Sequence, residues 1–172
     1  MHTVNDVSLT PIVPDFQTVS FLEQEGAIVC HPLTEGISAG ALRGAIAPGT
    51  VRFSARAVID HPAGRPAAIG LLLTSPTADP RAQIAELDRN GATSPSDVFS
   101  GWREVSAEQP ININVLLDTP VVSTMDLIIV SRAAEESVDF SWLKVRDFRV
   151  VKQEGGNEGV SMPAPAFAPV AA

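Results

Sequence analysis

The chain has 172 residues, which is enough for one domain with a substantial core, and its 45% apolar and 19% charged residues are typical of soluble globular proteins. Twelve Lys and Arg against 20 Asp and Glu give a net charge of −8, so the surface as a whole repels nucleic-acid phosphates and anionic lipid. We therefore expect no nucleic-acid partner. We also expect no membrane insertion, because the longest apolar run, residues 67–73, is far shorter than the roughly 20 residues of a membrane-spanning helix.

The two ends of the chain differ in composition from its middle. Residues 1–18 are polar and contain two prolines, which predicts an extended arm or a lead-in strand. Residues 153–172 are rich first in Gly and then in Ala and Pro; such a segment buries too little surface to fold alone and predicts a flexible tail. A single β domain is therefore expected over residues 19–152. No signal peptide is visible, and the sequence leaves the location open between the cytoplasm and a particle or surface structure.

The middle of the chain shows β patterns. Residues 50–60 and 110–118 alternate strictly between apolar and polar side chains, as half-buried strands do. Residues 67–75 and 125–132 are continuous apolar runs, which suit more central strands. Shorter strand candidates are residues 19–22, 27–31 and 102–107.

One segment, residues 79–91, has a helical pattern. Asp79 is suited to cap the helix, Pro80 to occupy its first position, and Asn90-Gly91 to end it. The helix would lie in the long loop that joins two strands. Many short strands with regular turns and no alternating helices predict an all-β fold, a jelly-roll-like antiparallel β-sandwich with one short helix in a long loop.

The last predicted strand, residues 139–151, has large apolar side chains on both parities. Phe140, Trp142, Phe148 and Val150 share one parity, and Leu143, Val145 and Val151 share the other. We predict a strand near the middle of the sandwich that is packed on both faces, with a bulge or bend near Arg146-Asp147. This interpretation places Trp142 in the core.

No catalytic motif is present, so we expect no enzymatic activity. The three histidines, His2, His31 and His61, form no metal-binding or catalytic pattern, and the sequence has neither a nucleophile elbow nor a phosphate-binding loop. Cys30 is the only cysteine and lies in an apolar run, where a free cysteine is usually a small buried side chain. An esterase or glycosidase remains a third hypothesis that no motif supports.

Binding has better support than catalysis. The polar faces of residues 50–60 and 110–118 would form a patch of donors for hydroxyl or carboxylate groups if the two strands are neighbours. A tryptophan at the start of a strand offers a stacking surface for a sugar ring, and a histidine and an arginine close two apolar strands where loops begin. A core tryptophan and a solvated sheet face are the structural alternatives. The candidate ligand-binding residues are Trp102, Arg52, Arg56, Asn112, Asn114, Arg132 and His31.

A structural calcium ion is the only cofactor that we consider. Glu25 near the first strand and Asp147 in the last would be neighbours in a sandwich, and Ca²⁺ takes such carboxylate ligands. No other cofactor is expected.

The order of five segments resembles a known pattern. The segments are AIVCHPL, ISAGALRGAIAPGTVRFSARAVI, GWREVSA, DLIIVSR and VDFSWLKVRDFRVV. Over residues 25–151 this order resembles the galactose-binding-like jelly-roll domains that are common in carbohydrate-binding modules. The layout is also similar to bacterial domains that accompany glycan-synthesis enzymes. The resemblance implies a non-catalytic binding or assembly role, with a ligand at the loop tips or on the concave sheet.

Two functional hypotheses follow. The first is a non-catalytic β-sandwich module that binds a glycan or a similar polar surface ligand. The alternative is a structural or interaction subunit of a larger assembly, such as a virion decoration or surface protein, which would bind a protein partner or further copies of itself. The predicted arm and tail favour the alternative, as does the low aromatic content of 5% with no tyrosine.

Overall fold

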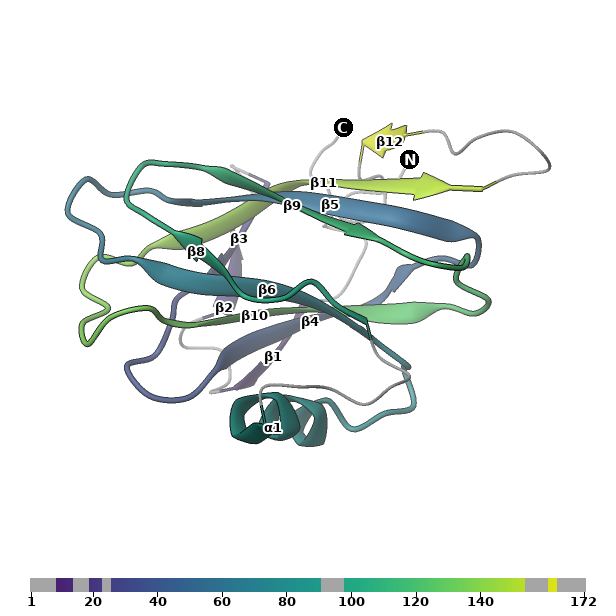
Figure 1. Ribbon diagram of the computed structural model, residues 1–172, viewed down its shortest axis with the longest axis horizontal. Helices are drawn as coiled ribbons and strands as arrows, with labels where there is room; N and C mark the ends of the chain where they lie inside the picture. Colours follow the sequence, from purple (N-terminus) through teal and green to yellow (C-terminus); the bar gives the residue numbers. More distant parts are fainter. Residues whose placement is uncertain (1–8, 14–18, 23–25, 91–97, 154–160, 164–172) are drawn as a thin grey trace.

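The computed structural model describes residues 9–13, 19–22, 26–90, 98–153 and 161–163. Two antiparallel sheets face each other (Figure 1). In that view the lower sheet has the strand order β1-β4-β10-β6-β7, with β8 also paired to β6, and the upper sheet has the order β2-β3-β11-β5-β9, with β12 also paired to β11.

Seven strands, β2, β3, β5, β6, β8, β9 and β10, agree with the sequence-based segments to within a few residues. The last predicted strand, β11, begins four residues later than expected, and β4 and β7 were not predicted as strands. The lower sheet consists of β1 (Leu9–Val13), β4 (Ser38–Ile46), β6 (Ala67–Thr74), β7 (Val98–Phe99), β8 (Arg103–Val105) and β10 (Met125–Ala133). The upper sheet consists of β2 (Val19–Leu22), β3 (Ala27–Cys30), β5 (Thr50–Ile59), β9 (Ile111–Leu116), β11 (Leu143–Lys152) and β12 (Ser161–Pro163).

From β3 to β11 the chain follows the connectivity of a jelly roll. Each strand passes to the opposite sheet, except where β6 is followed in its own sheet by β7 and β8. The orders β3-β11-β5-β9 and β4-β10-β6-β8 therefore interleave as two Greek keys. The predicted all-β, jelly-roll-like sandwich is confirmed, and the described residues include a single short helix.

The core between the sheets follows from the alternation along each strand. On β5, Phe53, Ala55 and Ala57 are at most 3% exposed, whereas Arg52 and Arg56 are exposed. β6 is buried along its whole length, because its inner face meets the core and its outer face is covered. The distinction between half-buried and central strands that the sequence predicts is therefore confirmed.

The helix α1 (Pro80–Asn90) covers the outer face of the lower sheet (Figure 1). Its predicted cap is confirmed, because the backbone N–H of Arg81 donates to Asp79 Oδ1 at 3.1 Å. Ile84 and Leu87 are 3% and 0% exposed and lie in a second apolar cluster outside the main core. The other buried members of that cluster are Ile37, Ala39, Ala41, Leu72, Ile128 and Val130.

The strand β11 contains the predicted bulge. Asp147 has a φ of 57°, in the left-handed region, and the pairing with β5 shifts register between Arg146 and Arg149. One extra residue switches the parity that faces the core. The buried core side chains of β11 are Leu143, Val145, Phe148 and Val150.

Two parts of the prediction for this segment are wrong. The strand is near the middle of its sheet but is not packed on both faces, because the bulge leaves Arg146, Asp147 and Arg149 on the outer side. Trp142 is not a core residue either: it is 51% exposed, and Phe140 is 50% exposed. Both aromatics lie in the turn that precedes β11, and their side chains point away from the core.

Parts of the two end segments belong to the sheets. β1, within the predicted arm, pairs with β4, and β12, within the predicted tail, pairs with β11. Within the described ranges, no helix has the length and apolar character needed to cross a membrane.

Candidate functional site

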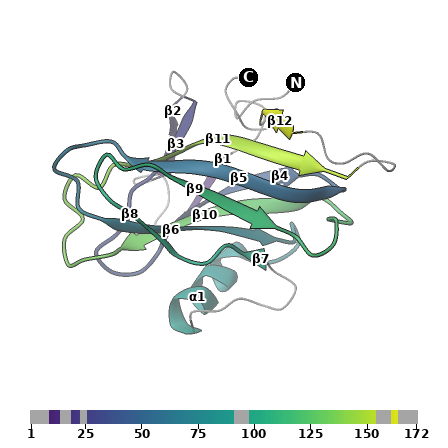
Figure 2. The same cartoon turned by 45° about the horizontal axis from the view of Figure 1, so that its top comes forward.

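The outer face of the upper sheet carries polar side chains in register across β9, β5 and β11, which run side by side in Figure 2. Arg56 lies opposite Asn112 and Ser54 lies opposite Asn114 across the β5–β9 pair. Across the β5–β11 pair, Arg149 lies opposite Ser54. The two strands that carry the predicted polar patch are therefore neighbours, and β11 extends the patch to a third strand.

A cavity of about 300 Å³ opens on this face, and we call it the polar trough. It is lined by Ser54, Ala55, Arg56, Asn112, Asn114, Asp147 and Arg149. Three of the predicted ligand-binding residues are among them. Arg52, a fourth, lies on the same face two residues beyond Ser54 and opposite Leu116.

The bulge supplies the side of the trough that sequence reasoning missed. The extra residue, Asp147, puts its exposed side chain on the outer face and shifts the following alternation so that Arg149 is also exposed. The signal was present in the sequence, since a bulge at Arg146-Asp147 implies this shift of parity. Because the strand was predicted to pack on both faces, Asp147 and Arg149 were not assigned to a surface site.

The face around the trough concentrates positive charge in an acidic chain. Five of the chain's 12 Lys and Arg lie on β5 and β11 with outward parity: Arg52, Arg56, Lys144, Arg146 and Arg149. Lys144 Nζ is paired with Asp60 Oδ2 at 2.9 Å. The four arginines form no ion pair with any other residue of the described ranges.

Among the described residues, the Lys144–Asp60 pair is the one ion pair near this face. Its hydrogen bond and charge hold the pKa of the Asp60 carboxyl below its ordinary value of 3.8, and the charge of Arg146 acts in the same direction more weakly. The side chain of Lys144 is only 10% exposed, whereas that of Asp60 is 59% exposed. The pair therefore lies at the surface with its ammonium end partly sheltered.

The 60–66 loop and the turn before β11, which lie towards the left-hand end in Figure 1, carry a group of rings that we call the aromatic ledge. Phe140 and Trp142 are exposed, and His61 is partly buried. His61 and Phe140 stack with their centroids 4.4 Å apart and an angle of 10° between planes. Trp142 directly precedes Leu143, which is buried in the core, and its carbonyl accepts from the Asp60 backbone N–H at 3.2 Å. The β5–β11 pairing thus continues to the ledge.

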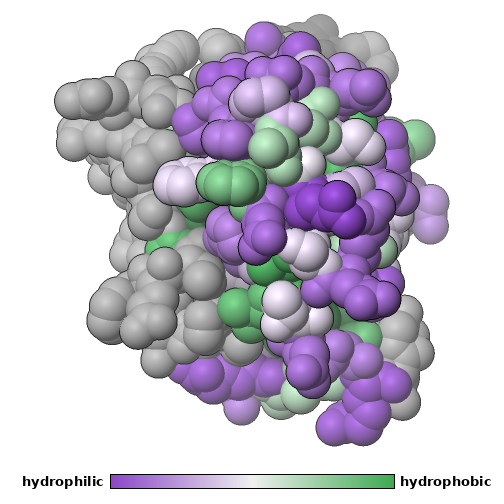
Figure 3. Space-filling model, turned by 90° about the vertical axis from the view of Figure 1, so that its left-hand side faces the viewer, coloured by the Kyte–Doolittle hydropathy of each residue, from purple (hydrophilic) through white to green (hydrophobic). Residues whose placement is uncertain are grey.

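The local backbone holds the ledge in an unusual conformation. Phe140 has a φ of 57°, which is rare for a bulky residue. Gly64 lets the 60–66 loop lie close to the backbone of Phe140, because a Cβ at position 64 would be only 2.7 Å from the Phe140 carbonyl oxygen. Figure 3 looks onto this end, where the coloured surface is mostly hydrophilic and hydrophobic residues form separate spots. The ledge is therefore a small apolar surface within a polar one.

Trp102 and Arg132 come together, but on the opposite side of the sandwich from the trough. Arg132 Cζ lies 4.1 Å from the centroid of the Trp102 ring, and Phe99 meets the same ring edge-on at 5.5 Å. The Trp102 ring packs beside the cluster under α1, and its buried Nε1 has no hydrogen-bond partner among the described residues. The predicted ligand set is thus divided between two faces.

The remaining predicted residues lie apart from the trough. His31 Nδ1 donates to the Pro32 carbonyl oxygen at 2.8 Å. Cys30 is buried as expected, and burial raises the pKa of its thiol to about 11.

The predicted calcium site stays a prediction. Glu25 lies outside the described residues, and Asp147 is in the trough. Among the residues that the structure does describe, no group of three or more His, Cys, Asp or Glu side chains is placed to hold a metal ion.

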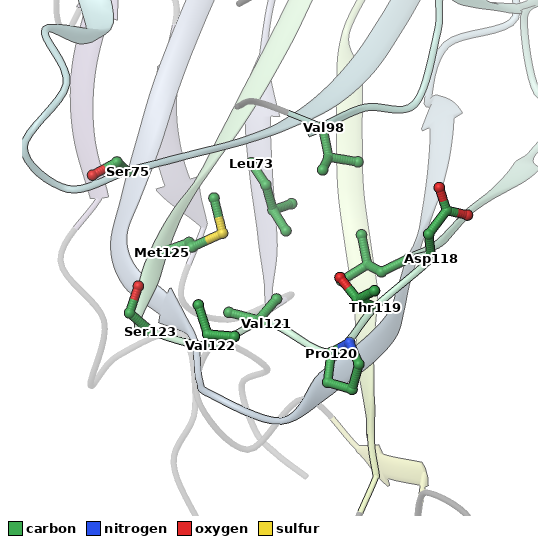
Figure 4. A pocket seen from close by; sticks show the side chains of 11 residues that line it. Leu73, Ser75, Val98, Asp118, Thr119, Pro120, Val121, Val122, Ser123 and Met125 are labelled. Atoms are coloured by element: carbon green, nitrogen blue, oxygen red, sulfur yellow. The ribbon is translucent and has the colours of Figure 1, made fainter. Parts of the chain in front are cut away.

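A second cavity, of about 390 Å³, lies beside the β9–β10 loop (Figure 4), which is at the right-hand end of the sandwich in Figure 1. The β9–β10 loop forms one wall, fixed by hydrogen bonds from the Gly49 N–H to the Val121 carbonyl (2.7 Å) and from the Val121 N–H to the Thr50 carbonyl (2.9 Å). Leu73 and Met125 line the other side. Sequence reasoning missed this cavity, because its apolar residues have the same pattern as ordinary core residues.

A family model described as "Family of unknown function (DUF6212)" matches residues 1–132. No curated protein matches the sequence. Among solved structures, the chain is similar to the CBM22-2 xylan-binding domain of Paenibacillus barcinonensis Xyn10C, with 11% identity, 74% of this chain and 78% of that chain covered, and a TM-score of 0.43. It is also similar to the CBM22-1–GH10 modules of Clostridium thermocellum xylanase 10B complexed with xylohexaose, with 11% identity, 90% and 28% coverage, and a TM-score of 0.45. A third similar structure is Desmodium yellow mottle tymovirus, with 12% identity, 81% coverage of each chain and a TM-score of 0.36.

Proposed function

The chain belongs to the DUF6212 family, a family of unknown function, and we propose that it is a non-catalytic β-sandwich module that binds a saccharide across the outer face of its upper sheet. The observation that carries this proposal is the polar trough, a cavity in which donors and acceptors from three neighbouring strands converge.

The side chains of the trough match the chemistry of sugar hydroxyls. Each hydroxyl both donates and accepts, and so do the amides of Asn112 and Asn114 and the hydroxyl of Ser54. Arg56 adds donors and Asp147 adds acceptors. Because all five residues stand on strands of one sheet, their positions are fixed before a ligand arrives, which lowers the entropic cost of binding.

The aromatic ledge supplies the apolar part of such a site. Trp142 is 51% exposed, and the flat face of an indole ring can pack against the C–H face of a sugar. Trp142 lies four residues from Arg146, which is about 13 Å along an extended strand. An oligosaccharide of several sugars could therefore contact the ledge and the trough together.

The proposed role is binding rather than hydrolysis. Asp147 is the only carboxylate among the described residues that line the trough. Glycoside hydrolysis generally uses a pair of carboxyl groups about 5–10 Å apart across the scissile bond.

A glycan array followed by isothermal titration calorimetry tests this proposal. We expect the wild-type chain to bind at least one class of oligosaccharide, and the double variant Asn112→Ala, Asn114→Ala to lose at least about tenfold in affinity. Arg89→Ala, on the exposed side of α1, is the matched control and should bind like wild type. Binding to no glycan on the array, or equal binding by the double variant, would contradict the proposal.

The alternative, a subunit of a larger assembly, has one structural observation in its favour. β9 is an edge strand of the upper sheet in the described part of the chain, and it presents Leu116 at 75% exposure; Val122 in the following loop is 91% exposed. Light scattering over a range of concentrations distinguishes the two functions. A concentration-dependent oligomer that Leu116→Ser disperses would support assembly, and a monomer at all concentrations would count against it.

A further inference from the structure

We infer that the polar trough selects an anionic saccharide, one whose sugars each carry a carboxylate. This inference rests on the proposed function and names the class of ligand for the same site. It starts from two like charges that face each other on neighbouring strands and have no ion-pair partner among the described residues.

Arg56 and Arg146 lie directly opposite each other on the neighbouring strands β5 and β11. Like charges in this position repel each other and destabilise a sheet. Neither guanidinium group forms an ion pair with a residue in the part of the chain that the structure describes. Although the chain has 20 Asp and Glu, none of those that the structure describes forms an ion pair with this arginine pair. Such a local conflict is typical of a functional site.

Two more arginines extend the uncompensated charge. Arg149 lines the trough, and Arg52 lies beyond it on the same face. Within the described ranges, the carboxylates on this face do not balance the four guanidinium groups: Asp60 is already paired with Lys144 at 2.9 Å, and Asp147 is the only carboxylate that lines the trough. The face is therefore a local positive field within a chain of net charge −8.

The guanidinium groups are suited to a carboxylate in particular. Arginine presents a planar fork of N–H donors that can bind both oxygens of a carboxylate at once. Asp147 would repel a polymer with several negative groups per sugar, such as a highly sulfated chain, but can accept hydrogen bonds from free hydroxyls. The combination favours one negative charge per sugar with the hydroxyls left free, which describes a uronic acid oligomer.

The central comparison of the test is between each uronic acid hexamer and its own uncharged methyl ester. Hexamers of galacturonic, glucuronic and mannuronic acid are titrated into the chain by calorimetry, each beside its fully methyl-esterified form, together with cellohexaose and dextran sulfate. We expect at least one acid hexamer to bind about tenfold or more tightly than its own ester. The difference should shrink as salt is raised from 20 to 500 mM, because the Debye length falls about fivefold over this range.

Variants connect the effect to the trough. Arg149→Gln and Arg56→Gln should each lose about tenfold or more in affinity for the acid hexamer and change affinity for its ester by much less. Arg149→Lys keeps the charge and should lose less than Arg149→Gln. Arg89→Gln, an exposed arginine on the other side of the molecule, is the matched control and should not change binding. Thermal unfolding of each variant checks that the fold is retained.

The outcomes separate this inference from the proposed function. Equal binding of acid and ester, binding of cellohexaose alone, or tighter binding of dextran sulfate than of every uronate would overturn the inference. In each of these three cases the proposed function would still be supported, provided that the double variant Asn112→Ala, Asn114→Ala loses the saccharide binding that the wild type shows. If no saccharide binds, both are overturned. Uronate binding that Arg149→Gln and Arg56→Gln leave unchanged would overturn the assignment to the trough.

Discussion

The two outer faces of the sandwich have the same strand geometry but opposite surfaces. On the lower sheet, Leu72, Ile128 and Val130 face outward and are covered by α1. On the upper sheet, Arg56 and Arg149 occupy outward positions and remain exposed. Helix coverage therefore follows the outward side chains: the helix α1 packs on the apolar face, and the charged side chains of the other face stay exposed to solvent.

The arginines of the two faces also make different contacts. On the lower sheet, Arg132 stacks on the Trp102 ring at 4.1 Å and contributes to the fold. On the upper sheet, Arg56 and Arg146 oppose each other, and neither forms an ion pair with a described residue. A charge that serves the fold should cost stability when it is removed, and a charge kept for a ligand should not. The following predictions test this difference.

The largest expected effect comes from the covered face. Leu87→Ala should lower the free energy of unfolding by about 2–5 kcal/mol, because Leu87 is fully buried between α1 and the sheet. Asn112→Ala on the open face should change it by less than about 0.5 kcal/mol. Urea denaturation with a fitted slope measures both. Similar losses for the two variants would contradict the division between a structural and a binding face.

The next effect concerns the bulge that shapes the trough. Asp147→Val should cost about 1–2 kcal/mol, because a β-branched residue is poorly tolerated at a φ of 57°. Asp147→Gly, which accepts this conformation, is the control and should be close to neutral in stability. Thermal unfolding of the pair checks the prediction; an equal loss in both variants would mean that the carboxylate, and not the backbone, determines stability here.

The architecture could be predicted from local patterns. Alternation on residues 50–60 and 110–118 placed the arginines and asparagines on one face, and the Asp79-Pro80 signal placed the start of the helix. Both depend on neighbours in sequence, and so did the bulge at Arg146-Asp147.

The site was only partly predictable, because its remaining parts depend on contacts between distant residues. Trp102 meets Arg132 across 30 positions, and nothing in either segment signals that stacking. Trp142 was assigned to the core because parity was counted through a turn that ends just before Leu143. Asp147 and Arg149 became trough residues only through the one-residue shift in register.

A smaller effect should have opposite signs on the two faces. Arg132→Gln should destabilise the chain by about 0.5–1 kcal/mol through loss of the contact with Trp102. Arg56→Gln should stabilise it by a few tenths of a kcal/mol, because repulsion with Arg146 is removed. The gain should fall at high salt, since screening already weakens the repulsion in the wild type. Parallel melting curves at low and high salt measure both effects, and a loss of stability in Arg56→Gln would show that this arginine serves the fold.

The smallest expected effect is the pH dependence of stability that comes from the Lys144–Asp60 ion pair. Lys144 lies on the open face, but unlike the arginines there it has a carboxylate partner. The pKa of Asp60 is lowered from 3.8 in the folded chain, so the pair contributes stability above about pH 3.8, and this contribution is lost as the pH falls through the lowered folded pKa. The effect is small because the Asp60 side chain is 59% exposed to solvent.

Asp60→Asn should therefore lower stability slightly at neutral pH and flatten the acid side of the profile below pH 3.8, as measured by urea unfolding at a series of pH values. Arg65→Gln, which breaks the exposed Arg65–Glu135 pair, is the control for a surface contact in the neighbouring loop. If Asp60→Asn keeps the full acid dependence of the wild type, Lys144 is held by other contacts, and the open face has no compensated charge of its own.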